Sequence, residues 1–169
     1  MNISEYQNYF ESKVHTSADF PYNTYLCTIP LDFTQVPVHW HNEAEIISIK
    51  QGRGMISIDL QEFPAGTGDI ILILPGQLHA IRQLGQERME YENILFMPSL
   101  LENGAKDLCA ERFLEPVFTG RACVDTIYKK SLPYYPEIRR LIDDIDSLCA
   151  RRPYGYQLLI KSRLYAFFF

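Results

Sequence analysis

The sequence predicts a mainly β domain of the sandwich or barrel type, followed by a C-terminal antiparallel helical hairpin. Segments rich in Ile, Val, Tyr and Phe recur at short intervals between residues 25 and 96, and Gly- and Pro-based turn signals separate them. No helical periodicity lies between these segments, which argues against alternating β-α units. Beyond residue 136 the apolar residues recur instead with the helical period.

Strands are expected, in chain order, at residues 25–30, 36–50, 54–60, 70–74, 79–83 and 89–96, with turns at 51–54, 64–68 and near residue 85. Segment 70–74 is apolar at every position, so we expect it to be buried on both faces and to run through the middle of the structure. Residues 4–14 are compatible with a short helix, and residues 15–23 with an extended arm.

The C-terminal part is expected to be helical. A helical turn is predicted at 99–102, a helix at 105–114, and irregular structure at 115–133. Pro136 stands where a first-turn proline belongs, and a second helix begins near Tyr154 after a break at 151–155. Two helices joined by a short loop form an antiparallel hairpin. The chain stops on three consecutive aromatics, which is typical of a helix cut in mid-course, so we expect a longer parent protein.

The first hairpin helix carries an apolar stripe with two interpretations. The stripe either packs against the barrel or the second helix, or it forms a two-fold interface in which the same patch meets itself. Because the second helix is apolar on more than one face, we expect dimerisation. The predicted interface residues are Ile138, Leu141, Ile142, Ile145 and Leu148.

Composition excludes several classes of protein. A chain of 169 residues with 47% hydrophobic and 22% charged residues is one ordinary globular domain, or one domain with a helical appendage. Its net charge of −5 argues against a charge-driven nucleic-acid surface. The N-terminus has no signal-peptide pattern, and no apolar run reaches transmembrane length, so we expect a cytoplasmic protein without membrane contact. Its four scattered cysteines are expected to be reduced thiols.

The histidines and one glutamate carry the chemical signal. In a strand spanning 37–50, the odd-numbered His39, His41 and Glu45 share one face. His79 begins another strand and can complete the cluster. Three imidazoles and a carboxylate suit a divalent transition metal such as Zn, Ni, Fe or Mn. The same parity predicts an effector pocket lined by His39, His41, Glu45, Ile47, Ile49 and His79.

The alternative to a metal centre is a pocket floor on which the same groups bind a small polar molecule directly. Glu43 shares the odd parity and competes with Glu45, but we expect it to be a charge at the rim. Trp40 is even-numbered and should face away from the imidazoles. His15 lies outside the pattern and is expected to be a surface or arm histidine.

These residues resemble a known family. The spacing H-x-H-x3-E-x6-G from His39 to Gly52 matches the first cupin motif, and Gly68, Gly76 and His79 hold the spacing of the second, with its proline one place late. This variant, with its apolar run at 70–74, resembles the sensor domain of AraC-type transcription regulators. The resemblance implies an N-terminal arm plus a cupin double-stranded β-helix (a jelly-roll barrel) at 1–98. It also implies a helical region at 99–169 with a dimerisation hairpin at 136–169, and DNA binding only through a C-terminal helix-turn-helix domain absent from this chain.

The resemblance further implies a function. The domain would bind a small polar effector such as a sugar in the barrel, form a homodimer and control transcription. The family's N-terminal arm folds over the pocket mouth, which makes Asp19, Phe20, Pro21 and Tyr22 candidate contacts. The alternative is a stand-alone cupin metalloenzyme of dioxygenase or isomerase type, with Glu43 or Tyr91 as acid or base. A third hypothesis is a carbohydrate-binding module without a conformational switch.

Overall fold

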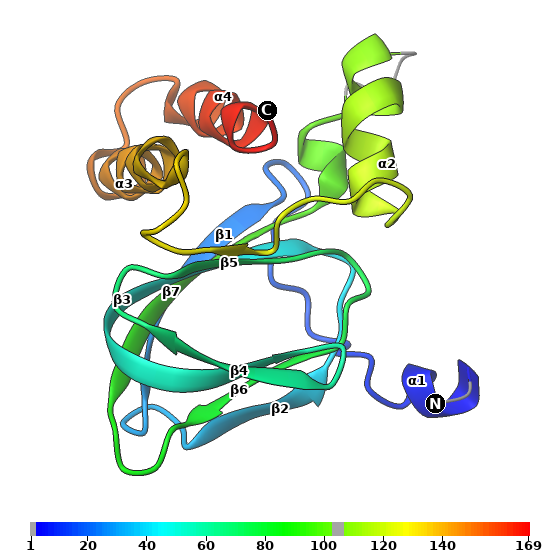
Figure 1. Ribbon diagram of the computed structural model, residues 1–169. Helices are drawn as coiled ribbons and strands as arrows, with labels where there is room; N and C mark the ends of the chain where they lie inside the picture. Colours follow the sequence, from blue (N-terminus) through cyan, green and yellow to red (C-terminus); the bar gives the residue numbers. More distant parts are fainter. Residues whose placement is uncertain (1–2, 103–106) are drawn as a thin grey trace.

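In the computed structural model, which describes residues 3–102 and 107–169, a β barrel carries a helical hairpin on one side (Figure 1). The strands are β1 (Tyr22–Ile29), β2 (Gln35–His39), β3 (Ala44–Ile58), β4 (Gln61–Gly66), β5 (Ile70–Ile73), β6 (His79–Gln83), β7 (Met89–Phe96) and β8 (Ile127–Tyr128). The helical segments are α1 (Ile3–Gln7), η1 (Pro98–Leu100), η2 (Ala110–Leu114), α2 (Glu115–Phe118), α3 (Tyr135–Arg151) and α4 (Tyr156–Phe167). The predicted fold class is confirmed.

The long strand β3 organises the barrel because it belongs to two facing sheets. Its first half pairs antiparallel with β5 and β7, and its second half pairs with β4 and β6. Strand β1 extends the first sheet beyond β7, β8 pairs with β5, and β2 pairs with β6. In Figure 1 the sheet with β1 and β5 lies under the helices, and β2, β4 and β6 lie on the opposite side.

The predicted turn at 51–54 is wrong, because β3 continues through it with a bulge between Ile49 and Gln51. Gly52 follows the bulge with φ of 81°, and a Cβ on it would lie 1.9 Å from the carbonyl oxygen of Arg88. A bulge glycine and a turn glycine meet the same backbone demand, so the sequence does not separate them. The expected strand 36–50 is instead interrupted at residues 40–43, between β2 and β3.

Strands β4 and β8 were not predicted from the sequence. β4 contains Pro64 and Gly66, which indicated a turn, but among the described strands it pairs with β3 alone, and an edge strand tolerates proline. The two-residue β8 lies in the segment expected to be irregular. The helix expected at 105–114 begins partly outside the described residues, at 105–106, and its described part runs on through α2 to Phe118.

Two apolar cores lie on the two faces of the sheet that contains β5. The core inside the barrel holds Ile47, Ile71 and Ile73, whereas the outer core holds Ile46, Ile70 and Leu72 and continues into the helices. All four residues of β5 are buried, which confirms that this strand runs through the middle of the structure. The alternation of side chains along each strand is what assigns neighbouring residues to different cores.

The hairpin of α3 and α4 covers the outer face of this sheet (Figure 1). The apolar stripe of α3 is buried within the chain, in the outer core, with exposed fractions between 0% and 8% for Ile138, Leu141, Ile142, Ile145 and Leu148. The prediction that these five residues form a dimer interface is therefore wrong for this arrangement, because packing against the barrel and α4 already covers them. The other interpretation, an internal packing stripe, matches the structure. Among the described residues, no helix is long and apolar enough to cross a membrane.

A polar joint connects the barrel to α3. The Lys50 ammonium of β3 forms ion pairs with Glu92 of β7, at 2.7 Å, and with Asp146 of α3. Burial first, and then the neighbouring Asp146, raise the pKa of Glu92 to about 7, against the lowering effect of Lys50. The joint therefore places a carboxyl with a near-neutral pKa where the sheet meets the hairpin.

Candidate functional site

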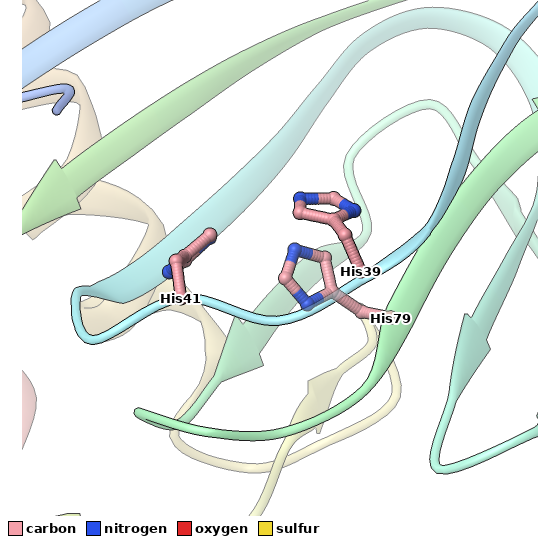
Figure 2. A group of neighbouring side chains, drawn as sticks. All are labelled: His39, His41 and His79. Carbon is pink, nitrogen blue, oxygen red and sulfur yellow. The ribbon is translucent and has the colours of Figure 1, made fainter. Parts of the chain in front are cut away.

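Three histidine side chains converge at one end of the barrel. His39 ends β2, His79 begins β6 directly opposite it in the strand pairing, and His41 lies in the corner that leads to β3. Figure 2 shows His39 and His41 along one segment and His79 on the neighbouring strand. The ring centroids are 4.1 to 5.6 Å apart, and one nitrogen from each ring lies within 4.8 Å of the others.

The three imidazoles share one protonation pattern. In each ring Nδ1 contacts a backbone carbonyl oxygen: Pro37 for His39 at 2.9 Å, Glu43 for His41 at 3.1 Å and Gln77 for His79 at 2.9 Å. Because a carbonyl oxygen only accepts, each Nδ1 carries its proton and donates it. In the neutral ring, Nε2 is then the nitrogen with a free lone pair. Backbone contacts of this kind orient histidines that bind metals.

Glu45, near the start of β3, adds a buried carboxylate to the cluster. Its Oε2 lies 3.1 Å from Nε2 of His41 and 3.1 Å from Nε2 of His79. The contact with His41 is a hydrogen bond in the doubly protonated ring, in which both nitrogens donate. Burial works to raise the pKa of Glu45, but the contacts with His41 and His79 outweigh it and hold that pKa far below its usual range. Glu45 is therefore a carboxylate at neutral pH, despite its burial.

The other ionisable groups respond to the same neighbours. Burial lowers the pKa of His39, and the charge of His79 lowers it further. For His41, burial is outweighed by Glu45 and then Glu43, which raise its pKa. Glu43 is not the rim charge that we expected, because it is buried and its carboxylate lies 3.6 Å from Nδ1 of His41. The corner at 40–43 turns Glu43 inward beside His41.

The donor set fits a transition metal. Nε2 of His79 is buried and makes no hydrogen bond among the described residues, although Glu45 is close. A buried nitrogen without a partner is unfavourable unless something else binds it. Imidazole nitrogens with a nearby carboxylate suit Zn, Ni, Fe or Mn. His39, His41 and His79 would hold the ion, with Glu45 at their flank.

A cavity of about 280 Å³ opens beside the imidazoles. Its lining comes from Glu11, Lys13, His15, Tyr25, Cys27, Phe33, Val36, His39, His41, Glu45, His79, Ile81, Tyr91, Asn93 and Leu95. Ile47 and Ile49 do share the inner face with Glu45, but they pack in the barrel core and are not part of this lining. The prediction of these two residues as pocket lining is therefore wrong. Alternation along a strand specifies which face a side chain is on, but not how far it lies from the mouth of the cavity.

Unpartnered polar atoms concentrate in this cavity. In the described part of the chain, six buried side-chain atoms have no hydrogen-bond partner, and four of them belong to lining residues: His15 Nδ1, His79 Nε2, Tyr91 Oη and Asn93 Oδ1. The other two are Asp146 Oδ1 and Glu92 Oε2 at the joint with α3, where the Glu92 oxygen keeps its ion pair with Lys50. Because buried polar atoms are normally satisfied, this concentration indicates a site that binds a polar molecule.

The N-terminal arm closes one side of the cavity. Trp40 faces away from the imidazoles, as predicted, and stacks on Tyr6 with ring centroids 4.7 Å apart, while Phe10 contacts its ring at 4.6 Å. Backbone hydrogen bonds join Trp40 to Tyr9 and Glu11. The motif that supplies the histidines thus also supplies the anchor for the arm.

His15 is an arm histidine, as expected, but it is not at the surface, because the arm carries it into the cluster. Its Nε2 lies 2.9 Å from Oε2 of Glu11, and its ring centroid lies 6.0 Å from that of His41. All four histidines of the chain therefore meet at one place. The arm residues predicted to reach the pocket, 19–22, lie elsewhere: Phe20 packs on Tyr156 of α4, and Tyr22 hydrogen-bonds Cys149 of α3.

Much of the pocket wall, on β1 and β7, was not predicted from the sequence. Tyr25 pairs with Asn93 and Cys27 pairs with Tyr91, so these alternate residues face the cavity together. Tyr91 was expected as a possible acid or base, and strand alternation places Asn93, two residues later, on the same face. Glu11 and Lys13 gave no comparable signal, since an arm without regular structure has no periodicity.

Known proteins resemble this chain in sequence and in fold. Residues 26–168 match the family model of the AraC-like ligand binding domain. Over 83 residues, the chain is 28% identical to an uncharacterized HTH-type transcriptional regulator, YbfI, of Bacillus subtilis, and the match covers 49% of this chain and 30% of the regulator. The match thus spans less than a third of the length of that relative.

Two solved structures are similar to this chain. A cupin protein from Bacteroides fragilis is 22% identical, with a TM-score of 0.43 and coverage of 52% of this chain and 71% of that one. A Cupin 2 conserved barrel domain protein from Salinispora arenicola is 20% identical, with a TM-score of 0.41 and coverage of 60% and 73%. At such TM-scores these likenesses carry no weight for the site. The family match extends from the first strand to the last helix, and the chain belongs to the family of AraC-like ligand binding domains.

Proposed function

We propose that this domain binds a small polar effector in the barrel cavity and serves as the sensor of a transcription regulator. One observation carries the proposal: four of the six unpartnered buried polar atoms in the described part of the chain line one cavity. A ligand that supplies partners to these atoms gains hydrogen bonds that the described protein groups do not supply. Membership of the family and the likeness to an HTH-type regulator support the sensor role.

We also propose that a divalent transition metal, Zn, Ni, Fe or Mn, binds at the imidazoles. His39, His41 and His79 would be its ligands together with Glu45, and a bound ion would supply a Lewis acid for an oxygen atom of the effector. The support is the set of three Nε2 atoms, each left with its lone pair in the neutral ring because Nδ1 donates to the backbone.

Signal output would pass through the hairpin and through parts of the longer protein. A DNA-binding helix-turn-helix domain in that protein would read out the effector, and a homodimer would present two such domains to DNA. An effector shifts such an equilibrium only by its different affinities for the two states. The joint of Lys50, Glu92 and Asp146 supports this route, since β7 carries Tyr91 and Asn93 on its cavity side and Glu92 on its hairpin side.

Elemental analysis of the purified domain tests the metal, with the double variant His39→Ala/His41→Ala as comparison. About one metal per chain, lost in the variant, is the expected result. The exposed pair Glu62→Ala/Arg82→Ala, on the β4–β6 side, is the matched control and should keep the metal. Folded protein without metal would remove the ion from the proposal and leave the cavity.

A thermal-shift screen of polar metabolites tests the effector. A ligand that binds only the folded chain raises its melting temperature, and the His39→Ala/His41→Ala variant should lose that shift. Analytical ultracentrifugation with and without a hit then tests the homodimer. A shift that survives both in the double variant and in Tyr91→Phe would place the ligand outside this cavity and contradict the proposal.

The second candidate function is a metalloenzyme of dioxygenase or isomerase type. It is favoured by Tyr91, whose buried hydroxyl lines the same cavity as the imidazoles and has no hydrogen-bond partner among the described residues. Burial raises the pKa of Tyr91, which keeps the hydroxyl protonated and suits it to donate rather than to act as a base. Turnover of a metabolite by the metal-loaded domain, lost in Tyr91→Phe, would favour this candidate over the sensor.

A further inference from the structure

Two carboxylates bracket the histidine cluster in matching ways. Glu45, from the barrel, contacts His41 and His79. Glu11, from the arm, lies 2.9 Å from Nε2 of His15 and 3.5 Å from Nε2 of His39. Each carboxylate oxygen therefore lies between two imidazoles. The two carboxylates differ in how firmly the surrounding structure holds them.

Glu45 is held by a buried strand, whereas the carboxylate of Glu11 is partly exposed. The side chain of Glu45 is 4% exposed on a central strand, and that of Glu11 is 30% exposed on the arm. A second cavity, of about 460 Å³, lies along the arm from Phe10 to Ala18 and shares Glu11 and Lys13 with the first. The backbone N–H of Glu11 is hydrogen-bonded to the carbonyl oxygen of Trp40, so the side chain of Glu11, which lines both cavities, is the part that can move. Few packing contacts oppose a movement of the Glu11 carboxylate.

Groups suited to an anion remain when Glu11 leaves. The Lys13 ammonium lies 5.3 Å from the centre of the Tyr25 ring and has no ion pair among the described residues. His15 and His39 lose their carboxylate partner, while Glu45 stays engaged with His41 and His79. The Lys13 ammonium and the Nε2–H of His15 can both donate to a carboxylate, so together they form a recognition site for that group.

The cavity wall formed by Tyr91 and Asn93 is suited to a ligand group other than a carboxylate. Tyr91 Oη and Asn93 Oδ1 are buried without partners, and Asn93 Oδ1 is an acceptor, so it requires a donor on the ligand. A hydroxyl group donates to Asn93 and accepts from Tyr91. A volume of about 280 Å³ holds a molecule of a few carbon atoms that carries both groups.

We propose that the carboxylate of Glu11 occupies the place of the carboxylate of the effector, and that the effector is a small hydroxylated organic acid. The arm is then a built-in competitor, and the effector displaces Glu11 from His15 and His39. This inference rests on the effector-binding function proposed above. It adds the chemical class of the ligand and the group that the ligand replaces.

Isothermal titration calorimetry on chelator-dialysed protein tests the inference, because removal of metal leaves only protein groups to bind an acid. The probes are gluconate and its neutral counterpart glucitol. The chains are the wild type, Glu11→Gln, Lys13→Gln in the Glu11→Gln background, and the exposed control Glu137→Gln. Circular dichroism verifies that each chain is folded.

We expect Glu11→Gln to bind gluconate about tenfold more tightly than the wild type, a gain of about 1.4 kcal/mol, because the competing charge is gone. Lys13→Gln should reverse this gain, and glucitol affinity should stay the same in every chain. Weaker gluconate binding in Glu11→Gln would show that Glu11 is not a place-holder. Binding of glucitol as tight as that of gluconate would overturn the acid class while the effector pocket stands. No gluconate binding to Glu11→Gln at millimolar concentration would overturn the inference, and the metal and thermal-shift experiments would still decide the proposed function.

Discussion

The two faces of the central sheet are packed to different degrees. On the outer face, Ile46, Ile70 and Leu72 meet the α3–α4 hairpin in a continuous apolar core. On the inner face, an apolar core fills only part of the barrel, and the rest is a cavity with unpartnered polar atoms. The same strands supply both faces by alternation. The comparison indicates that the outer face supplies stability and that the inner face gives up packing to bind a ligand.

The largest expected effect is on the outer face. Ile145→Ala should lower the free energy of unfolding by about 4 kcal/mol, because a fully buried isoleucine leaves a cavity that the hairpin and sheet cannot close. Urea denaturation followed by circular dichroism measures this loss. Leu158→Ala, on the exposed side of α4, is the control and should cost less than about 0.5 kcal/mol. Equal losses in the two variants would show that the hairpin does not pack on the sheet.

The bend of β3 between the two sheets is next in expected magnitude. Gly52→Ala should destabilise the fold by about 3 kcal/mol, since the new Cβ meets the carbonyl oxygen of Arg88 and the residue keeps a positive φ. Gly120→Ala also has a positive φ but open space around it, so it should cost only about 1 kcal/mol. Thermal unfolding of both variants separates the steric contribution from the conformational one. A similar cost in both would contradict the close approach at Gly52.

The polar joint between the faces should make stability depend on pH. The raised pKa of Glu92, about 7, means that between about pH 4.5 and 7 the folded chain keeps a proton that the unfolded chain has lost. The contribution of Glu92 to the free energy of unfolding is therefore fully present below about pH 4.5, and it is lost as the pH rises to about 7. Glu92→Gln cannot lose that proton, so its stability relative to the wild type should increase by about 1–2 kcal/mol across this window, after discounting for partial exposure.

Denaturation at pH 4.5, 6 and 7.5 measures the pH dependence of Glu92. The pH values bracket the window set by the raised pKa of Glu92. Glu90→Gln, on the same strand, is the matched control. A stability difference between Glu92→Gln and the wild type that is constant with pH would show that Glu92 is ionised in the folded chain throughout.

The smallest effect on stability is expected on the inner face. Tyr91→Phe removes a buried hydroxyl without a partner, so the free energy of unfolding should change by less than about 1 kcal/mol and in the stabilising direction. Ligand binding should nevertheless weaken, because the deep donor is lost. Thermal unfolding and titration of the same sample compare the two quantities. A destabilised Tyr91→Phe would show that the hydroxyl is satisfied in the folded chain, which would remove the contrast between the faces.

Several features follow from local sequence alone. Strands 79–83 and 89–96 were predicted with the bounds that the structure has, and β5 was correctly expected to be buried on both faces. The convergence of His39, His41, Glu45 and His79 followed from spacing, even though the strand expected at 37–50 is broken at its corner. These side chains still converge across the corner, so alternation along one strand predicted the correct cluster although two strands supply it.

Local sequence by itself determined the fold class, the helical hairpin and the barrel residues of the histidine cluster, because period and spacing are properties of neighbouring residues. Tertiary structure alone decided which apolar stripe is covered by its own chain, where Gly52 bends β3, and how deep Ile47 lies. It also brought Glu11, Lys13 and His15 to the cavity, through the stack of Tyr6 and Phe10 on Trp40. These contacts join residues far apart in the chain, and no local pattern encodes the partner of a side chain across such a distance.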